Sequence, residues 1–177
     1  KTDAAFFGSK NVIRGLRHYP SAPLDNYLVD YETRDFIMPY ECPQIETARG
    51  CMFECSYCNF PLLGQSKDVS VSKEEFKRQM QTGYEKWGIK NWRVMDETFN
   101  DRPSKLQKYA DAVDELGYNP WICGFARGDL VVRHKEHWDT YIRLGFLGHS
   151  MGLETFNREA GKLVRKGMDP TQIQEGL

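Results

Sequence analysis

Short apolar runs and longer apolar stripes with helical spacing alternate along the chain from residue 44 onward. Four of the runs are typical of buried strands, namely Gln44–Thr47, Trp92–Met95, Trp121–Phe125 and Phe146–Leu153. The other segments predict helices, which we expect at Ser72–Trp87, from Pro103 to the stop at Gly117, at His137–Leu144, at Asn157–Lys166 and from Asp169–Pro170 onward. This alternation predicts right-handed βαβ units, and therefore an α/β fold with a parallel sheet.

The first of these helices carries clear start and stop residues. Ser72 precedes it and Glu75 follows three residues later, which is the capping-box pattern. Its apolar stripe, Phe76 to Trp87, predicts packing against the core rather than a cofactor site. Gly88 ends the helix, since glycine favours the conformation that follows a last helical turn.

The first forty residues differ from the rest because prolines interrupt every apolar stripe. We expect residues 1–42 to form an irregular leader that packs on the core, with a short strand near Tyr27–Tyr31. Residues 43–177 then form the core domain. They hold only four strand–helix units, too few for a closed eight-unit barrel of about 250 residues. The expectation is a partial (βα) TIM-like barrel of parallel strands.

Composition and charge exclude several classes of protein. The chain has 177 residues, of which 24 are basic and 25 are acidic, so its net charge is −1. That balance gives no reason to expect binding to nucleic acid or to an anionic membrane. No apolar run approaches the roughly 20 residues of a membrane span, and the first residues do not resemble a signal peptide. We therefore expect a cytoplasmic protein.

Cysteines give the sharpest chemical signal. The chain has five, an odd number, and three of them lie close together as Cys51, Cys55 and Cys58. Such spacing favours a metal site over disulfides, and a structural zinc site would need a fourth ligand. We expect Cys42 and Cys123 to be buried thiols outside the site. Three thiolates on a four-iron cluster would leave one iron open for a small molecule.

The C-x3-C-x2-C spacing, after a short strand and Arg49-Gly50, resembles the signature of the radical S-adenosylmethionine (SAM) superfamily. In that family a 4Fe–4S cluster on three cysteines binds SAM and cleaves it to a 5′-deoxyadenosyl radical, which abstracts hydrogen from a substrate. The resemblance implies a flavodoxin- or ferredoxin-type reductant. The substrate cannot be read from the sequence.

The resemblance also assigns residues around SAM. Tyr57 would pack beside the SAM pocket and Phe60 near the adenine. Asp96 or Glu97, at the end of the second strand, would receive the SAM amino group. Adjacent strand residues point to opposite faces, so this choice stays open.

Further positions along the chain match the family. Arg127 corresponds to a residue that pairs with the SAM carboxylate, although a surface ion pair is the alternative. Glu154 ends the fourth strand within Gly152-Leu153-Glu154, and the alternative is a helix-capping role. These motifs, with Lys166-Gly167 and the acidic-Thr-Phe variant after the second strand, resemble the methylthiotransferase-like and cobalamin-associated branch. Cobalamin is therefore a possible further cofactor, although nothing within this segment indicates that it binds here.

Two histidine features have less specific interpretations. His149 either points into the barrel toward substrate or is a hydrogen-bonded core residue, and the second is commoner. The run Arg133–His137 is interpreted as a solvated loop and helix start, since its two histidines lack a third ligand.

Two expectations concern the whole protein. The family has six strand–helix units and four are counted here, so we expect the chain to be a fragment, incomplete at its C-terminus. The alternative to an enzyme is a non-catalytic metal-binding module, either structural zinc or an electron-transfer iron–sulfur protein. Acidic strand ends such as Glu97 and Glu154 discriminate the two, because a structural site does not need them.

Overall fold

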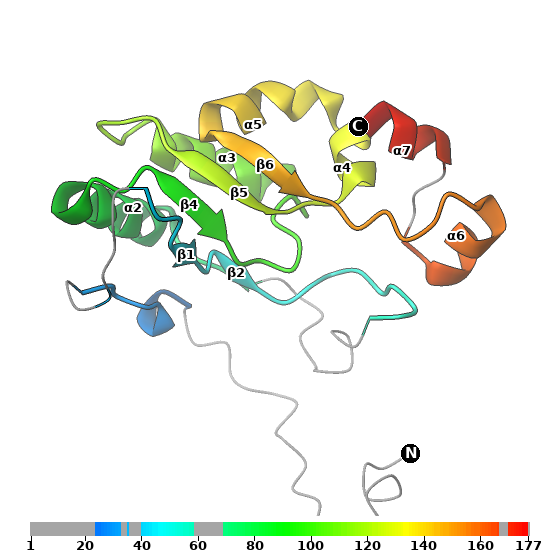
Figure 1. The fold of residues 1–177 in the computed structure, drawn as a ribbon, viewed down its shortest axis with the longest axis horizontal. Coiled ribbons are helices and arrows are strands. Elements are labelled where there is room, and N and C mark those ends of the chain that lie inside the picture. Colours follow the sequence, from blue (N-terminus) through cyan, green and yellow to red (C-terminus); the bar gives the residue numbers. More distant parts are fainter. Residues whose placement is uncertain (1–23, 33–34, 36–39, 59–68, 167–169, 177) are drawn as a thin grey trace, which may run out of the picture.

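The computed structural model describes residues 24–32, 35, 40–58, 69–166 and 170–176. Its centre is a parallel sheet in the order β1-β4-β5-β6, seen in Figure 1. The strands are β1 (Gln44–Ile45), β4 (Asn91–Val94), β5 (Trp121–Phe125) and β6 (Phe146–Ser150). All four lie where the apolar runs predict them, and β6 ends three residues earlier than expected.

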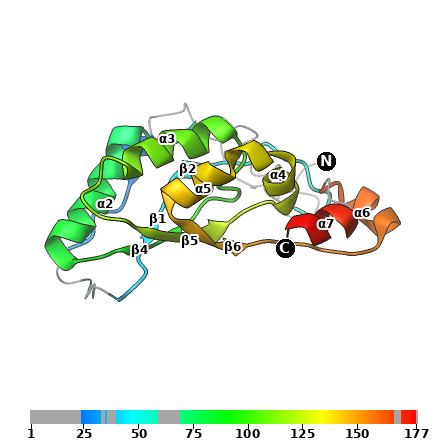
Figure 2. The same cartoon turned by 90° about the horizontal axis from the view of Figure 1, so that it is seen from above.

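The three main helices cover one face of this sheet, which is plain in Figure 2. They are α2 (Lys73–Trp87), α3 (Pro103–Val113) and α5 (Trp138–Leu144). Their apolar stripes pack against the inward side chains of the strands. The most buried large side chains of this core include Trp92, Tyr109, Phe76, Phe99, Phe146, Ile45 and Met80. The α2 stripe is therefore core packing, as predicted.

The other sheet face leaves apolar side chains in solvent. Met95, Trp121, Phe125 and Leu147 are between 38% and 64% exposed, although they belong to or follow strands. In a (βα) barrel the helices lie outside and this face lines the interior. The described residues thus form the four-strand portion of a partial TIM-like barrel, which confirms the predicted fold class.

Close strand packing requires a glycine in β5. Gly124 pairs with Val94 of β4, and a Cβ built on it would lie 2.2 Å from Val94 Cγ2. Any side chain here would therefore push β4 out of place. The neighbouring pair β5–β6 has a register irregularity between Ile122 and Cys123.

Short elements connect this frame, and the hydrophobic pattern did not predict several of them. An antiparallel pair, β2 (Ala48–Arg49) and β3 (Val69–Ser70), flanks the cysteine loop. Helix α4 (Gly128–Arg133) and the 3-10 turn η4 (Lys135–His137) precede α5. Two predicted helices follow β6, and the structure places them at Arg158–Val164 (α6) and Pro170–Gly176 (α7).

The helix ends match their sequence signals. Ser72 Oγ accepts the backbone N–H of Glu75 at 3.1 Å, and Gly88 adopts a left-handed conformation with φ 69°. The capping box is only half formed, because the Glu75 carboxylate pairs with Arg78 at 2.6 Å. The start and stop of α2 are therefore confirmed.

The predicted strand near Tyr27–Tyr31 is wrong. Leu24–Tyr27 is a 3-10 turn (η1), and residues 28–32 have no strand conformation. Side chains rather than a backbone ladder hold this segment, because Asp25 Oδ1 accepts the N–H of Ser72 at 2.8 Å. Tyr31 Oη also donates to the carbonyl of Gln44 at 2.6 Å. Leu24 is buried in the core, so the described part of the leader packs on the domain.

None of the helices within the described residues is both long and apolar enough to cross a membrane.

Candidate functional site

The loops at the carboxyl ends of the strands meet around a cavity of about 300 Å³. Ligand sites on parallel sheets lie at this edge. The lining combines the three thiols of the cysteine loop with charged and aromatic side chains from three other loops. These residues are Cys51, Phe53, Cys55, Tyr57, Cys58, Glu97, Thr98, Phe125, Ala126, Arg127, Ser150, Gly152, Glu154 and Lys166.

The cysteine loop is fastened to the end of α6. Ser56 Oγ donates to the carbonyl of Leu163 at 2.7 Å, and the Ser56 N–H donates to that of Val164 at 3.1 Å. Within the loop the N–H of Cys58 donates to the carbonyl of Cys55 at 3.1 Å. The two bonds of Ser56 join segments more than 100 residues apart, so α6 helps to define the loop that carries the thiols.

Tyr57, Glu154 and Lys166 form one hydrogen-bonded group on the cavity wall. Glu154 Oε1 accepts from Lys166 Nζ at 2.6 Å and from Tyr57 Oη at 2.9 Å, and Lys166 Nζ also donates to Tyr57 Oη at 3.1 Å. The hydrogen bond from Lys166 has the largest effect on the pKa of Glu154 and lowers it, and the bond from Tyr57 lowers it further. Glu154 therefore does not cap α6, and Asn157 Oδ1 does so by accepting the N–H of Ala160 at 2.9 Å.

The backbone around this group has little freedom. Glu154 adopts φ 62°, which is uncommon for a residue with a side chain. A Cβ on Gly152 would lie 2.5 Å from Glu154 Oε1 and 2.6 Å from Lys166 Nζ. A side chain at position 152 would therefore displace the ends of the Glu154 and Lys166 side chains from their present positions.

Arg127 is buried, at 7% exposure, and joins β5 to the cysteine loop. Its guanidinium donates to both carboxylate oxygens of Asp129 at 3.0 Å, to Cys55 Sγ at 3.6 Å and to the carbonyl of Lys166. It also stacks over the Phe53 ring, 3.8 Å from the centroid. The exposed surface ion pair considered from the sequence is excluded by this burial. The donors of Arg127 are largely used within the protein.

Glu97 faces the cavity, whereas Asp96 points into the core. Burial raises the pKa of Glu97, and hydrogen bonds from its own backbone N–H and that of Gly50 partly oppose this. Next to it, Thr98 Oγ1 lies 3.8 Å from Cys51 Sγ.

Asp96 belongs to a buried ionic network beneath the site. Its Oδ1 accepts from the N–H of Thr47 at 3.1 Å, from Thr47 Oγ1 at 2.5 Å and from the N–H of Ala48 at 2.9 Å. Its Oδ2 lies 3.2 Å from Lys105 Nζ, which is also 2.8 Å from Asp101 Oδ1. This network joins the strand that leads into the cysteine loop to the loop that carries Glu97.

The remaining predicted positions either lie away from the cavity or fall outside the described residues. Phe60 is outside the described residues. Cys42 is exposed, because it precedes the edge strand β1, so its prediction as a buried thiol is wrong. Cys123 is partly buried. His149 Nε2 donates to the carbonyl of Phe146 at 2.8 Å and its ring packs on Phe146, which confirms the core interpretation.

Two buried polar residues were missed by the sequence analysis. Lys105 lies on the apolar face of α3, one turn before Tyr109. A lysine within an apolar stripe indicates a buried cation, and this signal is present in the sequence. Asn100 exchanges hydrogen bonds with the backbone of Arg127 at 2.8 and 3.0 Å, which positions the start of α4. A short polar residue in a loop gives no comparable sequence signal.

The fold, the thiol-lined cavity and the sequence match agree on one class of protein. Residues 45–177 match the radical SAM superfamily, and the chain belongs to it. The predicted family is therefore confirmed, and with it an enzyme class whose cofactors are a 4Fe–4S cluster and SAM.

The relatives that the chain resembles are methylating or cobalamin-dependent. It is 24% identical over 144 residues to the hopanoid C-3 methylase of Methylococcus capsulatus (strain ATCC 33009 / NCIMB 11132 / Bath), covering 78% of the chain. The solved structure of the cobalamin-dependent SAM radical enzyme OxsB, with aqua-cobalamin bound, superposes with a TM-score of 0.64 at 17% identity over 76% of the chain.

A second structure, the radical SAM methyltransferase TsrM from Kitasatospora setae with tryptophan and a SAM analogue, gives a TM-score of 0.56 at 16% identity over 74% of the chain. These structural likenesses support the fold. The chain spans only 26% of the length of the methylase, 21% of OxsB and 26% of TsrM.

Proposed function

We propose that this chain is the SAM-cleaving core of a methyl-transferring radical SAM enzyme, with Cys51, Cys55 and Cys58 holding the 4Fe–4S cluster. The observation that carries the proposal is the cavity, which is lined by all three thiols together with Glu97, Glu154 and Lys166. A structural metal site has no need for this acidic and basic lining. The combination is suited to a ligand with both an amino and a carboxylate group.

The donor set suits a cluster better than a single ion. Ligands of one tetrahedral zinc ion, with Zn–S bonds of about 2.3 Å, lie roughly 3.8 Å apart. Among the described residues, the sulfur atoms of the three cysteines are not a group in which every ligand atom lies within 4.8 Å of the others. A four-iron cluster binds each thiolate at a different iron, so it suits wider spacing. This favours the enzyme over the zinc module.

Each lining residue then has a defined task. Glu97 receives the SAM amino group, in preference to Asp96, whose oxygens are engaged by Thr47, Ala48 and Lys105. Lys166 is placed to pair with a carboxylate while Glu154 and Tyr57 orient it. Arg127 positions the cysteine loop rather than SAM, because it donates to Cys55 Sγ and holds the loop against α4.

When bound, the cluster supplies the electron that cleaves SAM reductively. The residues of this chain bind and orient SAM and limit water in the cavity, and the chemistry belongs to the cofactor. The methylase and the methyltransferase TsrM support methyl transfer. The cobalamin-dependent enzyme OxsB supports cobalamin as a possible further cofactor. Two expectations stay predictions, namely a flavodoxin- or ferredoxin-type reductant and a cytoplasmic location. The substrate is not assigned.

Replacing Glu97 with alanine tests the SAM site. We expect SAM to bind the reconstituted protein more weakly by about 1–3 kcal/mol, because a charged hydrogen bond is lost. Binding is measured anaerobically by equilibrium dialysis with radiolabelled SAM. The matched control is Glu46→Ala, which removes a nearby carboxylate that pairs with Arg49 outside the cavity. Equal affinity in Glu97→Ala and the wild type would show that the amino group binds elsewhere.

A further inference from the structure

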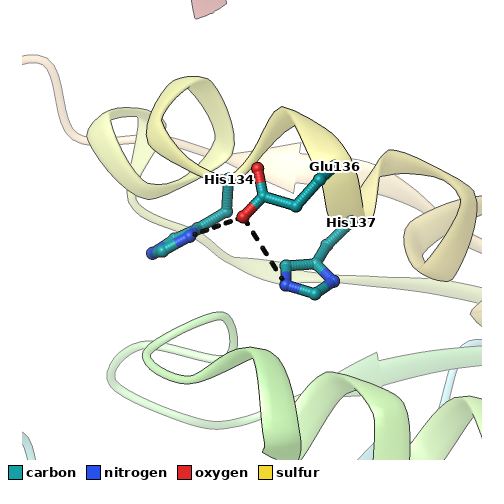
Figure 3. Close-up of side chains that lie close together, drawn as sticks. All are labelled: His134, Glu136 and His137. Carbon is teal, nitrogen blue, oxygen red and sulfur yellow. Dashed lines mark hydrogen bonds and ion pairs between the residues drawn. The ribbon is translucent and has the colours of Figure 1, made fainter.

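A second group of metal-ligating side chains lies at the junction of α4 and α5, outside the cysteine cavity. Figure 3 shows His134, Glu136 and His137 with their polar atoms turned toward one another. Glu136 Oε1 lies 3.3 Å from His134 Nδ1 and 3.7 Å from His137 Nε2. One ligand atom from each residue lies within 4.8 Å of the others.

The local backbone explains this convergence. Residues three apart eclipse one another in a 3-10 helix, so the turn η4 brings positions 134 and 137 to the same side. The N–H of His137 donates to the carbonyl of His134 at 2.9 Å, which closes the turn. Neighbouring contacts hold it, since Trp138 Nε1 donates to the carbonyl of Val131 at 2.9 Å and Lys135 pairs with Glu175 of α7 at 3.1 Å.

The spacing matches the coordination shell of a small ion. With metal–nitrogen and metal–oxygen bonds of about 2.0–2.2 Å, tetrahedral ligands lie roughly 3.3–3.6 Å apart. The two contacts of Glu136 are already close to that distance, and the side chains are partly exposed and able to close further. Two imidazoles with one carboxylate suit zinc, copper or nickel, whereas magnesium and calcium prefer oxygen ligands only.

We propose that His134, Glu136 and His137 form a second metal site, which binds a divalent transition-metal ion of the zinc class and leaves a coordination position open to water. The site follows α4, whose N-cap residue Arg127 contacts Cys55 Sγ at the other end of the helix. A bound ion would therefore stabilise the turn between α4 and η4. The proposal does not depend on the identity of the cluster.

Zinc binding tests this site directly. The probe is Zn²⁺, titrated by isothermal calorimetry into the full chain with Cys51, Cys55 and Cys58 replaced by alanine, so that the loop thiols cannot bind it. We expect saturable binding of one ion per chain. Glu136→Ala and His137→Ala should each weaken it by more than about tenfold, since even an outer-shell partner can contribute that much.

The control is Asp139→Ala, which removes an exposed carboxylate one turn further on and should leave zinc affinity unchanged. Replacing Zn²⁺ with Co²⁺ adds a spectroscopic check, because nitrogen and oxygen ligands give d–d bands without thiolate charge transfer. If the substituted chain does not fold, the same titration is made on the reconstituted protein, whose loop thiols are engaged. The proposal would be overturned if zinc did not bind saturably, or if His137→Ala left the zinc affinity unchanged.

Discussion

Cys55→Ala should abolish formation of the iron–sulfur cluster. Anaerobic reconstitution of the wild-type chain is expected to give about four irons and a broad visible absorption, as a four-iron cluster requires. Two remaining thiolates cannot hold that cluster. Cys55 is also the thiol that Arg127 contacts, so its loss removes both an iron ligand and a contact between the loop and β5.

Acid-labile sulfide and iron measured together with visible absorption check this result. Cys42→Ala is the matched control, because Cys42 is an exposed thiol outside the cavity and its loss should leave the cluster intact. Iron bound without sulfide would not count as cluster, since a histidine site could also take iron. A Cys55→Ala protein with wild-type sulfide content would contradict the ligand assignment.

Lys105→Met should strongly destabilise the fold. The lysine side chain is 2% exposed and lies between Asp96 and Asp101, whose side chains are as deeply buried. Removing it takes the lysine cation away from two buried carboxylates, although Asp101 keeps its ion pair with Arg102 at 3.2 Å. Breaking a buried ion pair typically costs about 3–5 kcal/mol. The free energy of unfolding, from urea denaturation of the apoprotein, measures the loss.

An exposed lysine provides the control for this substitution. Lys162 pairs with Glu159 at 2.8 Å, but both side chains are more than 60% exposed, so Lys162→Met should change stability little. A Lys105→Met variant as stable as the Lys162→Met variant would mean that the ion pairs of Lys105 beneath the site do not stabilise the fold.

The sheet was predictable because its strands are short apolar runs between strong helix signals. β5 was predicted at its observed ends, and Ser72, Gly88 and Pro103 marked helix boundaries that the structure reproduces. The pair β2–β3 was not, because two-residue strands around a long loop leave no periodicity. Helix α4 is a six-residue segment whose buried residues include Asp129, and a charged buried residue conceals the usual apolar stripe.

The candidate site was predictable at the level of the cysteine spacing and the strand ends. The choice between Asp96 and Glu97 needed coordinates, because it depends on which face of the strand end meets Thr47. Arg127 and Glu154 also each contact a residue distant in sequence, because Arg127 meets Cys55 and Glu154 meets Tyr57 of the cysteine loop. Sequence spacing alone does not bring such groups together.

Electron paramagnetic resonance of the reduced, reconstituted protein, recorded with and without SAM, tests the central claim most directly. An iron with no protein ligand should bind the amino and carboxylate groups of SAM, so the account predicts a reduced-cluster signal whose shape changes on adding SAM. Methionine amide serves as a control that lacks the free carboxylate. A cluster signal that SAM leaves unchanged, or a protein that carries zinc and gives no signal, would contradict the account.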